Sequence, residues 1–178
     1  MTLFKLALSD GPLTVVSIAL DLLGLGREHC QEIERRVNQK VPGAQLLIAC
    51  THTHHGPDTL GLWGPNERTS GIDADYLATL KEKITETALI ALDRMLPSLV
   101  KSASVKVSGV AKNARDPEIL DEELNCLQFS HRLSGEILAT WYIFPCHPEV
   151  LWEHNPNITS DYIYSLREQV EATTGAPC

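Results

Sequence analysis

The spacing of hydrophobic residues along the chain predicts alternating strands and helices. Short apolar runs predict six strands, at residues 3–9, 13–20, 44–50, 102–111, 125–130 and 137–144. Asp10-Gly11-Pro12 separates the first two runs, and such a short turn signal favours a β-hairpin. Helical periodicity predicts three helices, at residues 27–40, 73–98 and 160–173.

The helix predicted at residues 73–98 has the clearest pattern. Its apolar residues recur every three or four positions and form one stripe, which is typical of a helix packed on a core: Leu77, Leu80, Ile84, Ala88, Ala91, Leu92 and Met95. The order hairpin, helix, strand, helix, strands, helix predicts an α/β (α+β) layered domain with a mixed β-sheet flanked by helices. No repeat or linker interrupts it, so we expect a single domain over residues 1–178.

Composition and charge narrow the classes of function. The chain has 178 residues, 43% of them hydrophobic and 21% charged, which is typical of a soluble globular protein. A formal net charge of -8 argues against nucleic acid as a partner. No apolar run reaches the length of about 20 residues that spans a bilayer, so no transmembrane segment is predicted. Residues 1–10 do not resemble a signal peptide, so the chain as written is expected to be cytoplasmic, unless a longer N-terminus exists. The sequence does not indicate an oligomeric state.

The candidate chemistry begins at Thr51-His52-Thr53-His54-His55-Gly56-Pro57, directly after a predicted strand. In an extended backbone the side chains of His52 and His54 would share one face. Imidazole is the commonest metal ligand in proteins, so this pair predicts a metal site. A metallo-β-lactamase motif is disfavoured, because Gly56 and Pro57 stand where that motif needs Asp and His.

A further histidine follows another predicted strand. Residues 137–144 run into Pro145-Cys146-His147-Pro148, and two strands ending side by side in one sheet would bring His147 close to His52 and His54. Three nitrogen ligands leave one position for water, as in catalytic zinc sites. The alternative is that His147 caps its strand and bonds to backbone. Histidine ligation alone suits zinc, iron, nickel or copper, so the metal stays open at this point.

Four segments, in order, resemble the neutral/alkaline (non-lysosomal) ceramidase family. Residues 51–57 resemble its Thr-His-Thr-His-Ser-Gly-Pro segment, and Ala114-Arg115-Asp116-Pro117 is similar to its Asn-Arg-Ser-Pro segment. Residues 142–148 are similar to its second zinc-histidine strand. Residues 157–162 resemble the Ile-Ser-x-Asp segment that opens the next helix. The resemblance extends over most of the chain.

The resemblance implies a zinc-dependent hydrolase that cleaves the amide bond of N-acylsphingosine, with metal-activated water attacking the carbonyl. His52 and His147 would be zinc ligands, and His54 an acid/base or substrate-orienting group. Arg115 would hold a polar part of the substrate or the developing oxyanion. Asp161 is expected to cap the following helix and to accept a hydrogen bond from a site histidine.

The chain also departs from the family pattern. His55 replaces the usual Ser and Ala114 the usual Asn, and the family's other zinc ligands, a Glu and a Tyr, would lie downstream of Cys178. We therefore expect an incomplete catalytic domain that acts on a lipid or other small-molecule amide. The alternative is a non-catalytic metal-binding or truncated domain that lacks the full zinc site. An amidohydrolase barrel is disfavoured, because eight βα units need about 250 residues.

Overall fold

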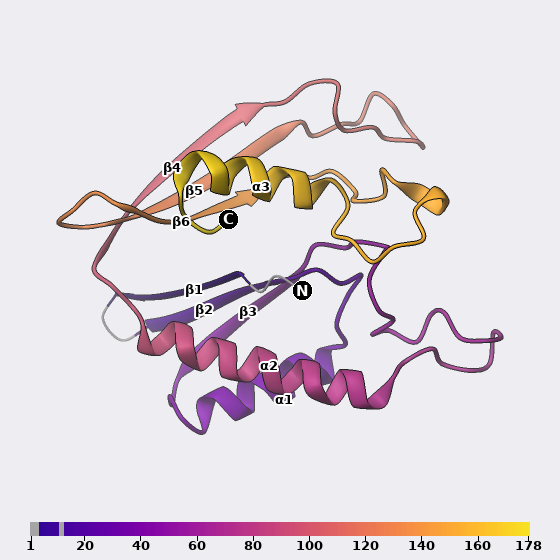
Figure 1. Cartoon of the computed structure of the whole chain (residues 1–178), viewed down its shortest axis with the longest axis horizontal. Helices are drawn as coiled ribbons and strands as arrows, with labels where there is room; N and C mark the ends of the chain where they lie inside the picture. Colours follow the sequence, from indigo (N-terminus) through magenta and orange to yellow (C-terminus); the bar gives the residue numbers. More distant parts are fainter. Residues whose placement is uncertain (1–3, 11–12) are drawn as a thin grey trace. The chain divides into compact units, whose positions relative to one another are not determined.

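The structure, a computed structural model, describes residues 4–10 and 13–178 (Figure 1). It divides into two compact units that are described in turn. Unit 1 comprises Met1–Met95 and Leu151–Asp161, and unit 2 comprises Leu96–Val150 and Tyr162–Cys178. The chain thus leaves unit 1 after the second helix and returns to it for one short segment.

Unit 1 contains the mixed sheet that the hydrophobic pattern predicted. Its strands are β1 (Phe4–Asp10), β2 (Leu13–Leu20) and β3 (Ala44–Cys50), in the order β1-β2-β3. β1 and β2 are antiparallel, as expected for a hairpin, although residues 11 and 12 of the predicted turn lie outside the described residues. β2 and β3 are parallel, with Val16 opposite Leu46. Parallel strands need a crossover, and the helix between them supplies it.

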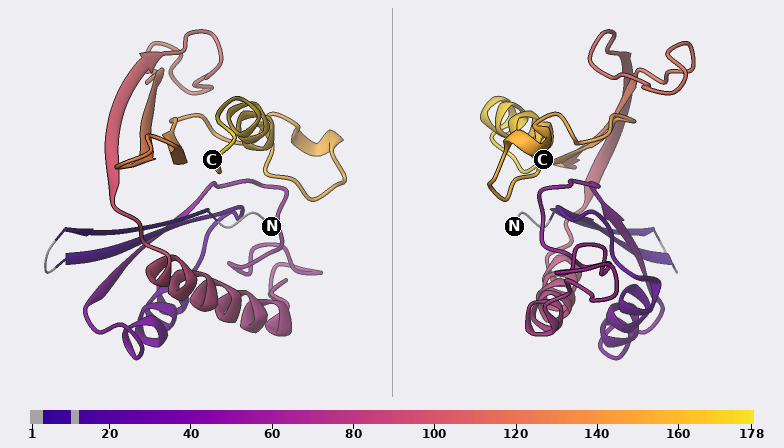
Figure 2. Two further views of the ribbon diagram at one scale, coloured as in Figure 1. Left: turned by 60° about the vertical axis from the view of Figure 1, so that its left-hand side comes forward. Right: turned by 90° about the vertical axis from the view of Figure 1, so that its right-hand side faces the viewer.

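Two helices pack on one face of this sheet. Figures 1 and 2 show α1 (Arg27–Asn38) and α2 (Ala74–Asp93) on the same side of β1–β3. The core between sheet and helices consists of alternate β2 residues and the apolar stripes of both helices: Val16, Ile18, Leu20, Ile33, Val37, Leu77, Leu80, Ile84, Ala88 and Leu92. Asp73 caps α2, because its carboxylate accepts hydrogen bonds from the backbone N–H groups of Asp75 and Tyr76.

The predicted end of α2 was wrong. The helix stops at Asp93, and Ser98 already begins the next strand. Pro97 accounts for the difference, since proline disfavours a helical conformation at the residue before it and lacks the N–H that a helix needs. Met95, which continued the apolar periodicity, lies beyond the helix and is 42% exposed.

Unit 2 is built on an antiparallel meander of β4 (Ser98–Lys106), β5 (Glu123–His131) and β6 (Ile137–Ile143). The final helix is α3 (Tyr162–Thr174), and a short 3-10 helix, η1 (Trp152–His154), belongs to unit 1. Beyond α3, Pro177 accepts a hydrogen bond from the backbone N–H of Thr140 in β6. The predicted fold class is confirmed, but β3 and β6 lie in different sheets, so the expectation that one sheet carries both histidine strands was wrong.

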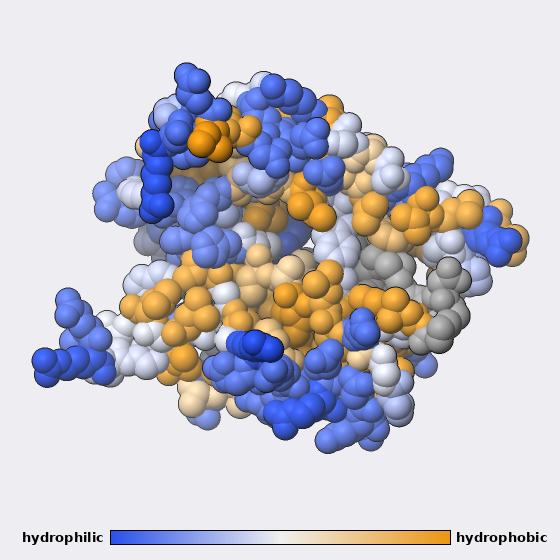
Figure 3. Space-filling view, turned by 180° about the vertical axis from the view of Figure 1, so that it is seen from behind, coloured by the Kyte–Doolittle hydropathy of each residue, from blue (hydrophilic) through white to orange (hydrophobic). Residues whose placement is uncertain are grey.

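Some hydrophobic side chains are exposed. Figure 3 shows them among the hydrophilic ones on the face seen from behind. Leu60, Leu62 and Trp63 in the loop after β3, and Leu151 and Trp152 near η1, are among the exposed large apolar residues of unit 1. Within the described residues, every helix is too short or too polar to cross a lipid bilayer.

Candidate metal site

The first histidine segment continues from the end of β3. The backbone N–H of Thr51 donates to Leu20 O at 2.8 Å, and that of His52 donates to Leu22 O at 3.0 Å. At His52 the backbone turns into the left-handed region, with φ 69°. The prediction that His52 and His54 alternate along an extended strand was therefore wrong in its geometry. Their rings are nevertheless neighbours, with centroids 5.3 Å apart in an edge-to-face arrangement.

The hydrogen bond of the His52 ring determines which nitrogen can bind a metal. Its Nδ1 lies 2.8 Å from the backbone carbonyl oxygen of Leu23. A carbonyl only accepts hydrogen bonds, so Nδ1 carries the hydrogen, and in the neutral ring Nε2 then has the lone pair. Metal-binding histidines usually donate their second ring N–H to such an acceptor. The left-handed backbone conformation of His52 costs about 1–3 kcal/mol. Two hydrogen bonds of His52 offset this cost, one from its ring Nδ1 to Leu23 O and one from its backbone N–H to Leu22 O.

The residues beside His54 anchor the segment. Thr53 is fully buried, and its Oγ1 donates to Thr159 O at 2.8 Å. The same oxygen accepts from the backbone N–H of His55 at 3.3 Å. Thr159 N–H in turn donates to His55 O at 3.2 Å. The segment that returns from unit 2 to unit 1 thus fixes the turn that carries His54.

Asp161 adds a buried carboxylate to this anchor. It has φ 58° and is 4% exposed, and its Oδ2 accepts from the backbone N–H of Leu151 at 2.9 Å. The same oxygen lies 3.7 Å from Nε2 of His55. Asp161 directly precedes α3, as the sequence indicated. The neighbouring histidine is His55, the residue that departs from the ceramidase pattern.

A loop closed by hydrogen bonds to Asp58 places an aromatic side chain beside His54. Oδ1 of Asp58 accepts from the N–H groups of Leu60 and Gly61 at 3.0 and 2.8 Å, and Oδ2 accepts from that of Trp63 at 2.9 Å. Burial tends to raise the pKa of Asp58, but these bonds outweigh it and hold the pKa below its usual value. The Trp63 and His54 ring centroids are 6.4 Å apart.

In unit 2, a cavity of about 500 Å³ is lined by both Arg115 and His147. Its walls come from residues 111–115 and 119–121 and from the segment after β6, at Pro145, Cys146, His147 and Glu149. Asn113 shapes the Arg115 side, because its Oδ1 accepts from the N–H groups of Arg115 and Asp116 at 3.0 and 3.2 Å. Two predicted site residues thus line one cavity within this unit.

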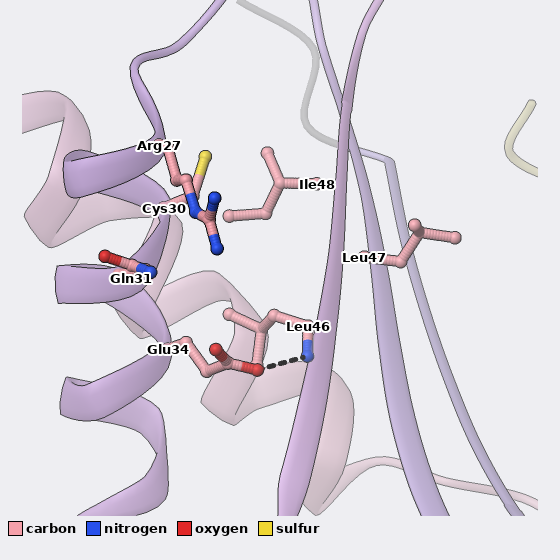
Figure 4. A pocket seen from close by; sticks show the side chains of 7 residues that line it. All are labelled: Arg27, Cys30, Gln31, Glu34, Leu46, Leu47 and Ile48. Atoms are coloured by element: carbon pink, nitrogen blue, oxygen red, sulfur yellow. Dashed lines mark hydrogen bonds between the residues drawn. The ribbon is translucent and has the colours of Figure 1, made fainter.

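A second cavity, of about 200 Å³, lies between α1 and β3 (Figure 4). Cys30 and Ile48 face each other across it, and Oε1 of Glu34 accepts from the Leu46 N–H at 3.3 Å. Its lining residues include neither the site histidines nor Arg115. We therefore assign the candidate chemistry to the histidine segments.

Sequence reasoning missed Asp58 and Glu149 and gave Thr53 no role. Asp58 had a detectable signal, because an Asp two or three residues before a glycine commonly folds a loop through its side chain. Thr53 had none, since its partner Thr159 is 106 positions away.

The side chains present fit a metal ion that histidine binds. Imidazole nitrogens are usual zinc donors, and two histidine rings are adjacent in unit 1, one with its tautomer fixed.

Among solved structures, the chain is similar to one described as "Ceramidase complexed with C2", with a TM-score of 0.71 and 20% sequence identity. The fold is ceramidase-like. The match covers 93% of this chain and 28% of that ceramidase chain. No protein-family model and no curated protein sequence matches this chain.

Proposed function

We propose that the chain is part of a zinc-dependent hydrolase that cleaves an amide bond, with N-acylsphingosine as the substrate and sphingosine and a fatty acid as products. The observation that carries the proposal is the His52–His54 pair, in which the Leu23 carbonyl accepts from Nδ1 of His52, so that the lone pair of the neutral ring is on Nε2. The ceramidase-like fold supports the choice of reaction.

In this proposal the three histidines have two roles. His52 and His147 are the ligands, and His54 handles protons. Zinc, when bound, lowers the pKa of water toward about 7 and polarises the substrate carbonyl. His54 accepts a proton from the attacking water and delivers it to the amide nitrogen as the C–N bond breaks. The Trp63 ring lies beside His54.

Arg115 stabilises charge on the substrate. Its guanidinium offers five donors in a planar fork, which suits a developing oxyanion or a polar headgroup. Asn113 positions its backbone, and the side chain borders the same cavity as His147. Arg115→Lys keeps the charge and loses the fork, so turnover should fall while zinc content is unchanged.

The first test is zinc content, measured by plasma mass spectrometry. We expect near-stoichiometric zinc in the wild type and its loss in His52→Ala and His147→Ala. His154→Ala is the matched control, because His154 is exposed in η1 and outside the candidate group. A wild type that holds no zinc after zinc is added and the excess removed would contradict the proposal for this chain.

The second test separates the enzyme from the non-catalytic alternative. A short-chain N-acylsphingosine with a fluorescent acyl group is incubated with the zinc-loaded chain and with the longest available reading frame. Release of the fluorescent fatty acid, lost in His54→Ala, supports the hydrolase. Stoichiometric zinc without hydrolysis in either protein would instead favour a metal-binding module.

A further inference from the structure

The loop after β6 brings a carboxylate onto the ring of His147. Nδ1 of His147 lies 3.0 Å from Oε2 of Glu149. The backbone N–H of Glu149 also donates to His147 O at 2.9 Å. This i to i+2 bond is that of a γ-turn, and the central residue is Pro148. The proline ring fixes φ close to the value that an inverse γ-turn needs, so the two side chains are held together by the backbone between them.

The contact favours one tautomer of the neutral His147 ring. An ionised carboxylate has no hydrogen to offer, so the ring nitrogen beside it, Nδ1, is the one that carries the hydrogen, and Nε2 then has the lone pair. The arrangement matches that of His52, where the Leu23 carbonyl is the acceptor. Two proposed ligands in different units therefore present the same ring nitrogen by different means, one through a neutral carbonyl and one through a carboxylate. A charged acceptor also raises the basicity of the imidazole, which strengthens its bond to a metal.

We propose that Glu149 is a positioning residue that fixes the Nδ1–H tautomer of His147 and thereby strengthens zinc binding. Glu149 is not itself a ligand in this proposal, because its carboxylate is engaged by Nδ1 on the side of the ring away from Nε2. The inference rests on the proposed function for the role of the metal. The tautomer itself belongs to the metal-free protein and can be measured separately.

The tautomer is measured first, by long-range ¹H–¹⁵N NMR of the histidine rings in metal-free protein. The spectra are recorded at a pH of about 8.5, about two units above the usual histidine pKa of about 6.5. We expect Nδ1–H for His147 in the wild type and in Glu149→Gln, whose amide oxygen still accepts. Glu149→Ala should shift His147 toward Nε2–H. Glu153→Ala, which removes an exposed carboxylate nearby in sequence, should leave His147 unchanged.

Zinc affinity is measured next on the same four proteins. Loss of such an orienting partner typically weakens metal binding by 10–100-fold. We expect about tenfold for Glu149→Ala, at the low end of that range, because the side chains of His147 and Glu149 are 49% and 31% exposed. Glu149→Gln should recover most of the affinity.

Two results would overturn the inference. One is that His147 keeps its Nδ1–H tautomer in Glu149→Ala. The other is that the wild type binds zinc and Glu149→Ala binds it with the same affinity. A wild type that binds no zinc would overturn the proposed function and, with it, the metal-strengthening role of Glu149. The tautomer measurement would still decide whether Glu149 positions His147. Circular dichroism of each variant excludes unfolding as the cause.

Discussion

Replacing Thr53 by valine should destabilise unit 1 although the two side chains have the same shape. The substitution removes the buried hydroxyl that donates to Thr159 O and accepts from His55 N–H. A buried backbone group left without its partner costs about 1–3 kcal/mol. For a chain of this length each kcal/mol lowers Tm by about 2–4 °C, so we expect a loss of roughly 2–12 °C.

The matched control is Thr53→Ser, which keeps the hydroxyl and removes one methyl group. Its cost should be close to the value for one buried methylene, about 0.8 kcal/mol. Urea unfolding followed by tryptophan fluorescence and by far-UV circular dichroism gives the free energy of unfolding of each variant. Two probes are needed because the chain has two compact units. If Thr53→Val proved as stable as the wild type, or more stable than Thr53→Ser, the anchoring role of the hydroxyl would be refuted.

Two further predictions concern the loop and a buried thiol. Gly71→Ala would place a Cβ 1.9 Å from Trp63 O, so it should displace the loop and change the Trp63 fluorescence; Gly26→Ala, where the added Cβ meets only the movable end of Glu28, should not. Unaltered emission in Gly71→Ala would contradict the predicted displacement of the loop. Burial raises the pKa of the Cys50 thiol from its ordinary 9.0 to about 11. The folded state therefore holds this proton more tightly than the unfolded state, and stability should fall as pH rises from about 9 to about 11. Urea midpoints across this window should fall less in Cys50→Ala, and equal slopes would contradict the assignment.

The strands and the core helices could be predicted because their signal is local. Alternation in β2 and the three- and four-residue steps in α2 depend only on nearby positions. The same periodicity placed the predicted end of α2 at residue 98, because Met95 fits the helical spacing of apolar residues. The helix nevertheless ends at Asp93, ahead of Pro97. Strand periodicity also says nothing about partners, so the two sheets could not be told from one.

The histidine pair illustrates a correct expectation reached by the wrong geometry. His52 and His54 are neighbours, yet His52 has a left-handed backbone that an alternating strand does not contain. That conformation is held by the carbonyls of Leu22 and Leu23, about thirty positions earlier. Glu149, by contrast, lies two residues from His147. His-Pro-Glu could have been noticed in the sequence, since proline at the centre of a tight turn brings its neighbours together.

The bond between Thr53 and Thr159 has a consequence for the time course of synthesis. The histidine turn leaves the ribosome 106 residues before the segment that anchors it. At roughly 5–20 residues per second this delay is on the order of 5–20 s. During that interval β1–β3, α1 and α2 can assemble, while the turn that carries His54 lacks its acceptor at Thr159. A nascent chain should therefore acquire the ordered histidine pair only after residues 159–161 have emerged.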